Sequence, residues 1–88
     1  MFNDLITTKN IPKIDLHGET SDISVIYLKK FILENYKLKV KYFVVIHGIG
    51  KDIIRKAIYE ELNINKFVEE YKMDMYNPGC TIVKLKLL

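Results

Sequence analysis

The chain has 88 residues, of which 49% are hydrophobic and 28% charged, values typical of one small soluble globular domain. Its net charge of +3, from 14 Lys and Arg against 11 Asp and Glu, mildly favours a polyanionic partner. The longest apolar run, at residues 42–46, is far shorter than the roughly 20 residues of a membrane span. The first ten residues, with Asp4 early and no sustained apolar stretch, are not expected to be a secretory signal. We therefore expect a cytoplasmic protein without a membrane segment.

The chain is expected to begin with a flexible segment at residues 1–12, ahead of one domain at residues 13–88. Residues 13–17 are predicted to form a short strand. Residues 20–35 are predicted to form a helix with Thr20 as its N-cap, because a threonine side chain can accept a hydrogen bond from the first turn. Apolar residues at helical spacing give this helix one buried face: Val25, Leu28, Phe31 and Ile32.

The second half of the chain adds three strands and one helix. Residues 39–46 are predicted to form a central strand, because their continuous apolar run indicates burial on both faces. The remaining elements are a helix, a strand, a tight turn and a last strand, at residues 51–62, 67–76, 77–79 and 81–87. Helical crossovers imply parallel neighbours, and the tight turn implies an antiparallel hairpin. We therefore predict an α/β fold of the two-layer α+β sandwich type, with a four-stranded mixed sheet and two helices.

Two short strings stand just past the first two predicted strands: Asp-Leu-His-Gly at residues 15–18 and His-Gly-Ile-Gly at residues 47–50. The carboxyl ends of parallel strands are where α/β domains place their ligand sites. Asp15, His17 and His47 are therefore expected to converge there. Two imidazoles can serve as acid and base in one reaction, and Asp15 can orient the ring of His17 or raise its pKa.

The same residues allow two other interpretations. Asp15, His17 and His47 can bind a metal directly, although two histidines and one aspartate are a weak ligand set. Alternatively, the site is structural, with Asp15 and His17 capping a strand end and His47 buried with its hydrogen bonds satisfied. The lone cysteine, Cys80, is expected to pack as a small hydrophobic residue.

The two motifs at residues 15–18 and 47–50 are followed by Ile-Arg-Lys at residues 54–56 and Gly-Cys-Thr-Ile-Val at residues 79–83. With these strings in this order, the chain resembles the small MutS-related (Smr) domain over about residues 13–88. The resemblance implies a fold similar to the C-terminal domain of translation initiation factor three. It also implies work on nucleic acid, since several members are nicking or RNA-cleaving endonucleases and some are linked to ribosomes and messenger RNA. Carried over by position, the residues that match the two motifs are Asp15, His17, His47, Gly48 and Gly50.

The favoured function is an endonuclease that cleaves RNA or structured DNA. On RNA, one histidine would take the proton of the 2′-hydroxyl and the other would protonate the leaving oxygen, with no cofactor required. On DNA water must attack, so a divalent metal would help. Phosphate contacts are expected from backbone amides of residues 48–52 and from nearby glycines and basic residues: Gly18, Gly48, Gly50, Lys51, Arg55, Lys56 and Gly79.

The chain departs from the family pattern at Ile49, where a lysine is usual, and at Lys51 and Asp52, where a threonine-glycine pair is usual. The turn at residues 77–79 is also shorter. These departures and the small charge excess favour one alternative, a non-catalytic nucleic-acid or ribosome-binding module. A protein-interaction or homodimerisation domain is a further alternative. A lysine-rich stretch between two tyrosines either stacks unpaired bases or packs at a strand entrance: Tyr36, Lys37, Lys39, Lys41 and Tyr42.

Overall fold

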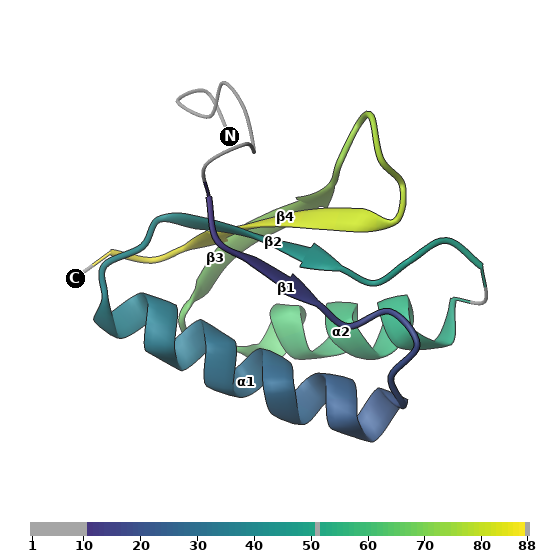
Figure 1. The fold of residues 1–88 in the computed structure, drawn as a ribbon. Coiled ribbons are helices and arrows are strands. Elements are labelled where there is room, and N and C mark those ends of the chain that lie inside the picture. Colours follow the sequence, from purple (N-terminus) through teal and green to yellow (C-terminus); the bar gives the residue numbers. More distant parts are fainter. Residues whose placement is uncertain (1–10, 51, 88) are drawn as a thin grey trace.

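The computed structural model describes residues 11–50 and 52–87. Of the expected flexible segment, residues 1–10 lie outside the described residues. The elements follow the predicted order of strand, helix, strand, helix, strand, strand (Figure 1). They are β1 (Lys13–Asp15), α1 (Ser21–Lys37), β2 (Tyr42–Ile46), α2 (Ile53–Ile64), β3 (Val68–Met73) and β4 (Cys80–Leu85).

The four strands form one mixed sheet in the order β1-β2-β4-β3. Strands β1 and β2 are parallel, as predicted, and β4 is antiparallel to both of its neighbours. The expectation that both crossovers join neighbouring strands is wrong for the second one, because β4 lies between β2 and β3. The reason lies in composition: β4 is largely buried and needs a central place, whereas β3 carries Glu69, Glu70 and Lys72 and suits an edge.

Both helices cover the same face of the sheet (Figure 1). The main core lies between these two layers and is built from residues of both helices and of the central strands, among them Leu28, Ile32, Phe43, Ile58, Val83 and Leu85. Thr20 caps α1 as predicted, since its Oγ1 accepts a hydrogen bond of 3.2 Å from the Ile23 amide. Ser24, which faces this core, is fully buried.

A smaller cluster lies on the other face of the sheet. It consists of Tyr42, Val44, Cys80 and Ile82, with Ile11 and Ile46 packed against it. The burial of β2 on both faces, which its continuous apolar run predicts, is confirmed. Cys80 is buried in this cluster, and burial raises the pKa of its thiol, so that it packs as a hydrophobic residue. Among the described residues no helix is long and apolar enough to cross a membrane.

Candidate functional site

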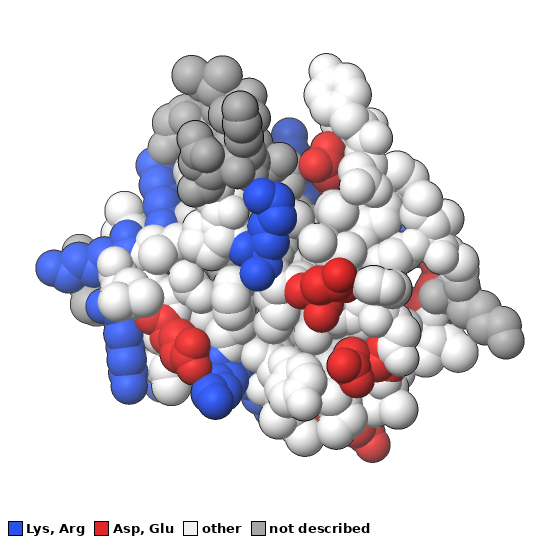
Figure 2. Space-filling view, viewed as in Figure 1, with Lys and Arg blue, Asp and Glu red and all other residues white. Residues whose placement is uncertain are grey.

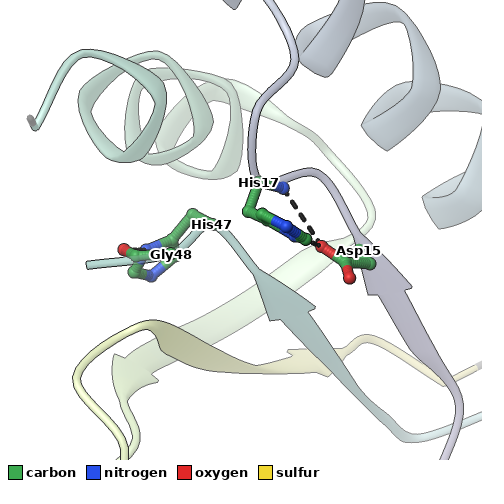
Figure 3. A network of polar contacts seen from close by, with 4 residues as sticks. All are labelled: Asp15, His17, His47 and Gly48. Carbon is green, nitrogen blue, oxygen red and sulfur yellow. Dashed lines mark hydrogen bonds and ion pairs between the residues drawn. The ribbon is translucent and has the colours of Figure 1, made fainter. Parts of the chain in front are cut away.

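The parallel pairing of β1 and β2 brings the two sequence motifs to one edge of the sheet. Asp15 is in register with Ile46, and the Leu16 amide continues the pairing with a hydrogen bond of 2.7 Å to the Ile46 carbonyl. One step further along, a Cβ atom at Gly48 would lie 3.2 Å from the Cβ of His17. Figure 3 shows the resulting group, in which the His17 ring turns toward Asp15 and the His47 ring points away from both.

Asp15 holds His17 by two hydrogen bonds to a single carboxylate oxygen. The oxygen Oδ1 accepts from the His17 amide at 3.1 Å and from the ring nitrogen Nδ1 at 2.5 Å. This is an Asx-type turn, in which an aspartate binds the backbone two residues ahead. Because Nδ1 faces Asp15, the other ring nitrogen, Nε2, is left for a ligand. The side chain of His17 is 67% exposed, so a substrate can reach it.

The Asp15–His17 pair has a defined electrostatic character. The hydrogen bond from His17 lowers the pKa of the Asp15 carboxyl, and the same bond together with the carboxylate charge raises the pKa of His17. When His17 loses its proton, the proton that leaves is the one on Nε2, because Nδ1–H stays bound to Asp15. The pair can therefore act as an acid or a base at a fixed, solvent-facing atom.

His47 has a different environment. Its side chain is buried, and burial lowers its pKa. The ring nitrogen Nδ1 lies 3.1 Å from the Gly48 carbonyl oxygen, and Nε2 lies 2.8 Å from the Thr81 hydroxyl. Both nitrogens thus have partners inside the protein, which is the arrangement of a buried imidazole with satisfied hydrogen bonds. For His47 to touch a substrate, one of these two bonds must first break.

Gly79, in the turn before β4, joins the second motif to the last strand. Its carbonyl oxygen accepts hydrogen bonds of 2.9 Å from the amides of both His47 and Gly48. The Gly48 amide was expected to bind phosphate, but it is already used inside the protein. A Cβ atom at Gly79 would lie 3.3 Å from the Gly48 carbonyl carbon and from Ile49 Cγ1, so this turn packs tightly against the motif.

The other residues predicted to bind phosphate do not form the compact basic site that their closeness in the sequence indicates. Gly18 and Gly50 are exposed, with no heavy atom within 4 Å of a Cβ placed on either. Arg55 pairs with Asp52 at 2.9 Å, which offsets its positive charge, and Lys56 is exposed. Lys51 lies outside the described residues. Helix α2 begins at Ile53, two residues later than predicted.

Charge is distributed unevenly over the molecule. Figure 2 shows Lys and Arg gathered toward the side where α1 ends, and Asp and Glu more numerous toward the side where α1 begins and the two motifs lie. The lysine-rich stretch belongs to the basic side. Its two tyrosines pack within the protein, since Tyr36 contacts Phe67 at a ring-centroid distance of 4.3 Å and Tyr42 is 6% exposed. They are therefore packing residues and are not free to stack bases.

Among the described residues, no group of three His, Cys, Asp or Glu side chains is placed to share a metal ion. His47 therefore does not join Asp15 and His17 in one set of metal ligands. Two residues that were not predicted as site residues surround His47. Thr81, fully buried on β4, is hydrogen-bonded to His47, and Tyr59 of α2 is hydrogen-bonded to Thr81. The signal for Thr81 was a hydroxyl on the same face of β4 as the buried Val83 and Leu85.

Comparisons with known proteins agree with this fold. The Smr domain family model matches residues 14–86. An endonuclease MutS2 of Caldicellulosiruptor bescii is 33% identical over 88 residues, which cover 96% of this chain and 11% of that protein. The endonuclease MutS2 of Clostridium tetani is 36% identical over 77 residues, covering 84% of this chain and 10% of its own length. The chain thus spans about a tenth of these curated relatives.

Solved structures give the same result. The crystal structure of the Smr domain of Thermus thermophilus MutS2 has a TM-score of 0.81 and 26% identity, covering 86% of this chain and 99% of that one. YdaL of Escherichia coli, a stand-alone small MutS-related protein, has a TM-score of 0.80, covering 84% of this chain and 63% of that one. At 18% identity this second likeness concerns the fold alone. With the family model matching most of its length, the chain belongs to the Smr domain family.

Proposed function

We propose that this domain is an endonuclease that cleaves RNA or structured DNA, with Asp15 and His17 as its catalytic pair. One observation carries the proposal: the His17 side chain is 67% exposed and its ring is oriented by Asp15 through Nδ1, which leaves Nε2 for a substrate. This is the geometry of a general acid or base that is fixed in one tautomer. The relatives named endonuclease MutS2 support the same class of activity.

RNA is the substrate that needs the fewest groups at this site. Its own 2′-hydroxyl supplies the nucleophile, so that His17 Nε2 can take the hydroxyl proton as the oxygen attacks the adjacent phosphorus. The P–O5′ bond then breaks, leaving a 2′,3′-cyclic phosphate and a 5′-hydroxyl, and the leaving oxygen takes a proton from water or from His17. Messenger RNA on the ribosome is the particular RNA that the family resemblance suggests. We assign His47 a positioning role in this scheme, because both its ring nitrogens are occupied.

A second candidate is a nucleic-acid-binding module that does not cleave. The observations that favour it are the neutralised Arg55, the occupied Gly48 amide and Ile49 at a position where the family usually has lysine. All three weaken the hold on a phosphate next to His17. In this candidate the basic side of the molecule would provide most of the affinity.

Gel-resolved cleavage of labelled structured RNA, ribosome-bound messenger RNA and supercoiled DNA separates the two candidates. We expect wild type to cut RNA to cyclic-phosphate ends, His17→Ala to lose cleavage, and Glu19→Gln, an exposed change close to the site, to cut normally. Parallel reactions with EDTA show whether cleavage needs a divalent metal. If wild type and His17→Ala bind the same RNA equally and neither cuts any substrate, the endonuclease proposal is wrong and the binding module stands.

A further inference from the structure

A chain of hydrogen bonds runs from helix α2 through strand β4 to the second motif. The Tyr59 hydroxyl lies 2.9 Å from Thr81 Oγ1, which lies 2.8 Å from His47 Nε2, and His47 Nδ1 lies 3.1 Å from the Gly48 carbonyl oxygen. Thr81 is fully buried and His47 is 5% exposed, so water has little access to either side chain. In a buried chain of this kind, each missing partner leaves an unsatisfied polar group.

The partners fix the direction of every bond in this chain. A carbonyl oxygen only accepts, so His47 Nδ1 must carry the proton and donate to Gly48. In the neutral ring Nε2 then accepts, which makes the Thr81 hydroxyl its donor. Because the single proton of Thr81 is used in this way, Tyr59 must donate to Thr81. The Tyr59 ring is itself held against Tyr71, at a centroid distance of 4.8 Å, and lies edge-on to His47.

The chain ends on the peptide that packs against the catalytic pair. The Gly48 carbonyl is bound by His47, and its amide donates to the Gly79 carbonyl at 2.9 Å. Gly48 is therefore fixed on both sides, and its α-carbon faces the Cβ of His17. Any rotation of the His47 ring would release the Gly48 carbonyl and loosen the surface on which His17 rests.

We propose that Thr81 and Tyr59 are positioning residues of this site, which hold the His47 ring in place so that its Nδ1–H stays bound to the Gly48 carbonyl and Gly48 stays pressed against His17. Of the two, Thr81 has the larger role, because it bonds the ring directly. Tyr59 acts on the orientation of the Thr81 hydroxyl. The effect on cleavage rests on the proposed function, whereas the orientation of the ring and the fixation of Gly48 do not.

Three variants test the proposal: Thr81→Val, which keeps the shape and removes the hydroxyl, Thr81→Ser, which keeps the hydroxyl, and Tyr59→Phe. Nitrogen-15 NMR of the imidazoles should show Nδ1–H and unprotonated Nε2 for His47 in wild type and Thr81→Ser. In Thr81→Val we expect the ring signals to shift and the Gly48 amide to exchange with solvent about tenfold faster, as the loss of one buried hydrogen bond implies. For Tyr59→Phe we expect ring signals and a Gly48 exchange rate between those of wild type and those of Thr81→Val.

Cleavage provides the second readout. We expect kcat of Thr81→Val to fall about tenfold with KM within about twofold, and Thr81→Ser to restore most of kcat. Thermal unfolding of each variant verifies that it is folded. If Thr81→Val is folded and keeps the wild-type His47 ring signals and Gly48 exchange rate, the proposal is overturned. If these change while no protein cuts RNA, the positioning role holds and only the proposed function fails.

Discussion

Gly48 approaches His17 so closely that a Cβ atom on the glycine would lie 3.2 Å from the Cβ of the histidine. Gly48 also has a φ of +85°, in the left-handed region that side chains disfavour. The second motif thus needs a glycine for two independent reasons at one position. The contact links the two motifs, which are some thirty residues apart in sequence, through the parallel pairing of β1 and β2.

Gly48→Ala is expected to lower both stability and cleavage. The positive φ costs about 1–2 kcal/mol of unfolding free energy in an alanine variant, and the close contact moves His17. Gly18→Ala is the matched control, since Gly18 has a φ of +82° but no heavy atom within 4 Å of its Cβ position. We expect both variants to lose stability in urea unfolding and only Gly48→Ala to shift the His17 ring signals in NMR. Equal shifts in both would contradict the role of the contact.

Asp15→Asn is expected to lower the pKa of His17 toward its ordinary value of 6.5. The carboxylate raises this pKa by its hydrogen bond and charge, and an amide provides no charge. If Nε2 acts as a base, cleavage rises as the pH rises through the His17 pKa. The pH profile of Asp15→Asn should therefore move to lower pH together with the NMR titration, while Glu19→Gln leaves both unchanged. A profile that stays in place while the NMR pKa moves would assign the base to another group.

The two histidines give opposite pH dependences of stability. His47 has a lowered pKa in the folded protein, so the unfolded chain takes up more protons below pH 6.5. The contribution of His47 to folding stability is therefore present above pH 6.5 and is lost as the pH falls toward the pKa of His47 in the folded protein. His17 has a raised pKa, so its contribution is present below pH 6.5 and is lost as the pH rises through its folded pKa.

Urea unfolding between pH 7.5 and 5 separates these contributions when His17→Ala is the parent. In this parent the opposing effect of His17 is absent, so the loss of stability on acidification should be steeper than in wild type. Adding His47→Gln should reduce the slope of the unfolding free energy against pH, whatever it does to the absolute stability. An unchanged slope after that addition would mean that His47 takes up its proton in the folded state as readily as in the unfolded chain.

The sequence predicted the elements and the meeting of the two motifs at one edge of the sheet, but the expected convergence of His47 with Asp15 and His17 is wrong, because both ring nitrogens of His47 bind Gly48 and Thr81. Helix caps and strand alternation are local, which is why Thr20 and the buried β2 were identified correctly. The place of β4 between β2 and β3 depends on which strand can be buried on both faces, a comparison between distant segments. The occupied Gly48 amide likewise depends on Gly79, which no spacing rule connects to it.

Charge shows the same limit. The sequence has a basic cluster around residues 51–56, but the fold pairs Arg55 of this cluster with Asp52 at 2.9 Å. The exposed lysines at the end of α1 lie toward the opposite side of the molecule (Figure 2). Whether a lysine contributes to a binding surface thus depends on its partner and its side, and neither is visible in the sequence.

We expect the exposed lysines at the end of α1 to contribute more to nucleic-acid affinity than Arg55. Replacing Lys37 and Lys39 by Gln should weaken binding and reduce the slope of log affinity against log salt by about 1–2, as the loss of two phosphate contacts predicts. Arg55→Gln should change the slope little, because Asp52 already neutralises Arg55. Filter binding between 50 and 200 mM salt measures both. A larger effect of Arg55→Gln would place the phosphate path beside α2 instead.

The loop between β3 and β4 carries two large side chains that have almost no contact with the protein. Tyr76 is 92% exposed and Met75 is 81% exposed. Gly79 of the same loop packs against the second motif, so the Tyr76 ring offers the proposed nucleic-acid site a platform for an unpaired base. Such stacking contributes about 1–3 kcal/mol per base. Because so little of Tyr76 is buried, its replacement should leave the stability of the fold unchanged.

Tyr76→Ala is therefore expected to weaken binding of unpaired RNA at least about fivefold, which corresponds to the lower end of that range. Tyr76→Phe keeps the ring and should bind as wild type does. A duplex of the same sequence, whose bases are already stacked, should bind all three proteins equally. Tyr27→Ala, which removes an exposed tyrosine from α1, is the control for a general surface effect. If Tyr76→Ala weakens duplex and unpaired RNA to the same degree, the tyrosine acts through the shape of the loop, and stacking is not its role.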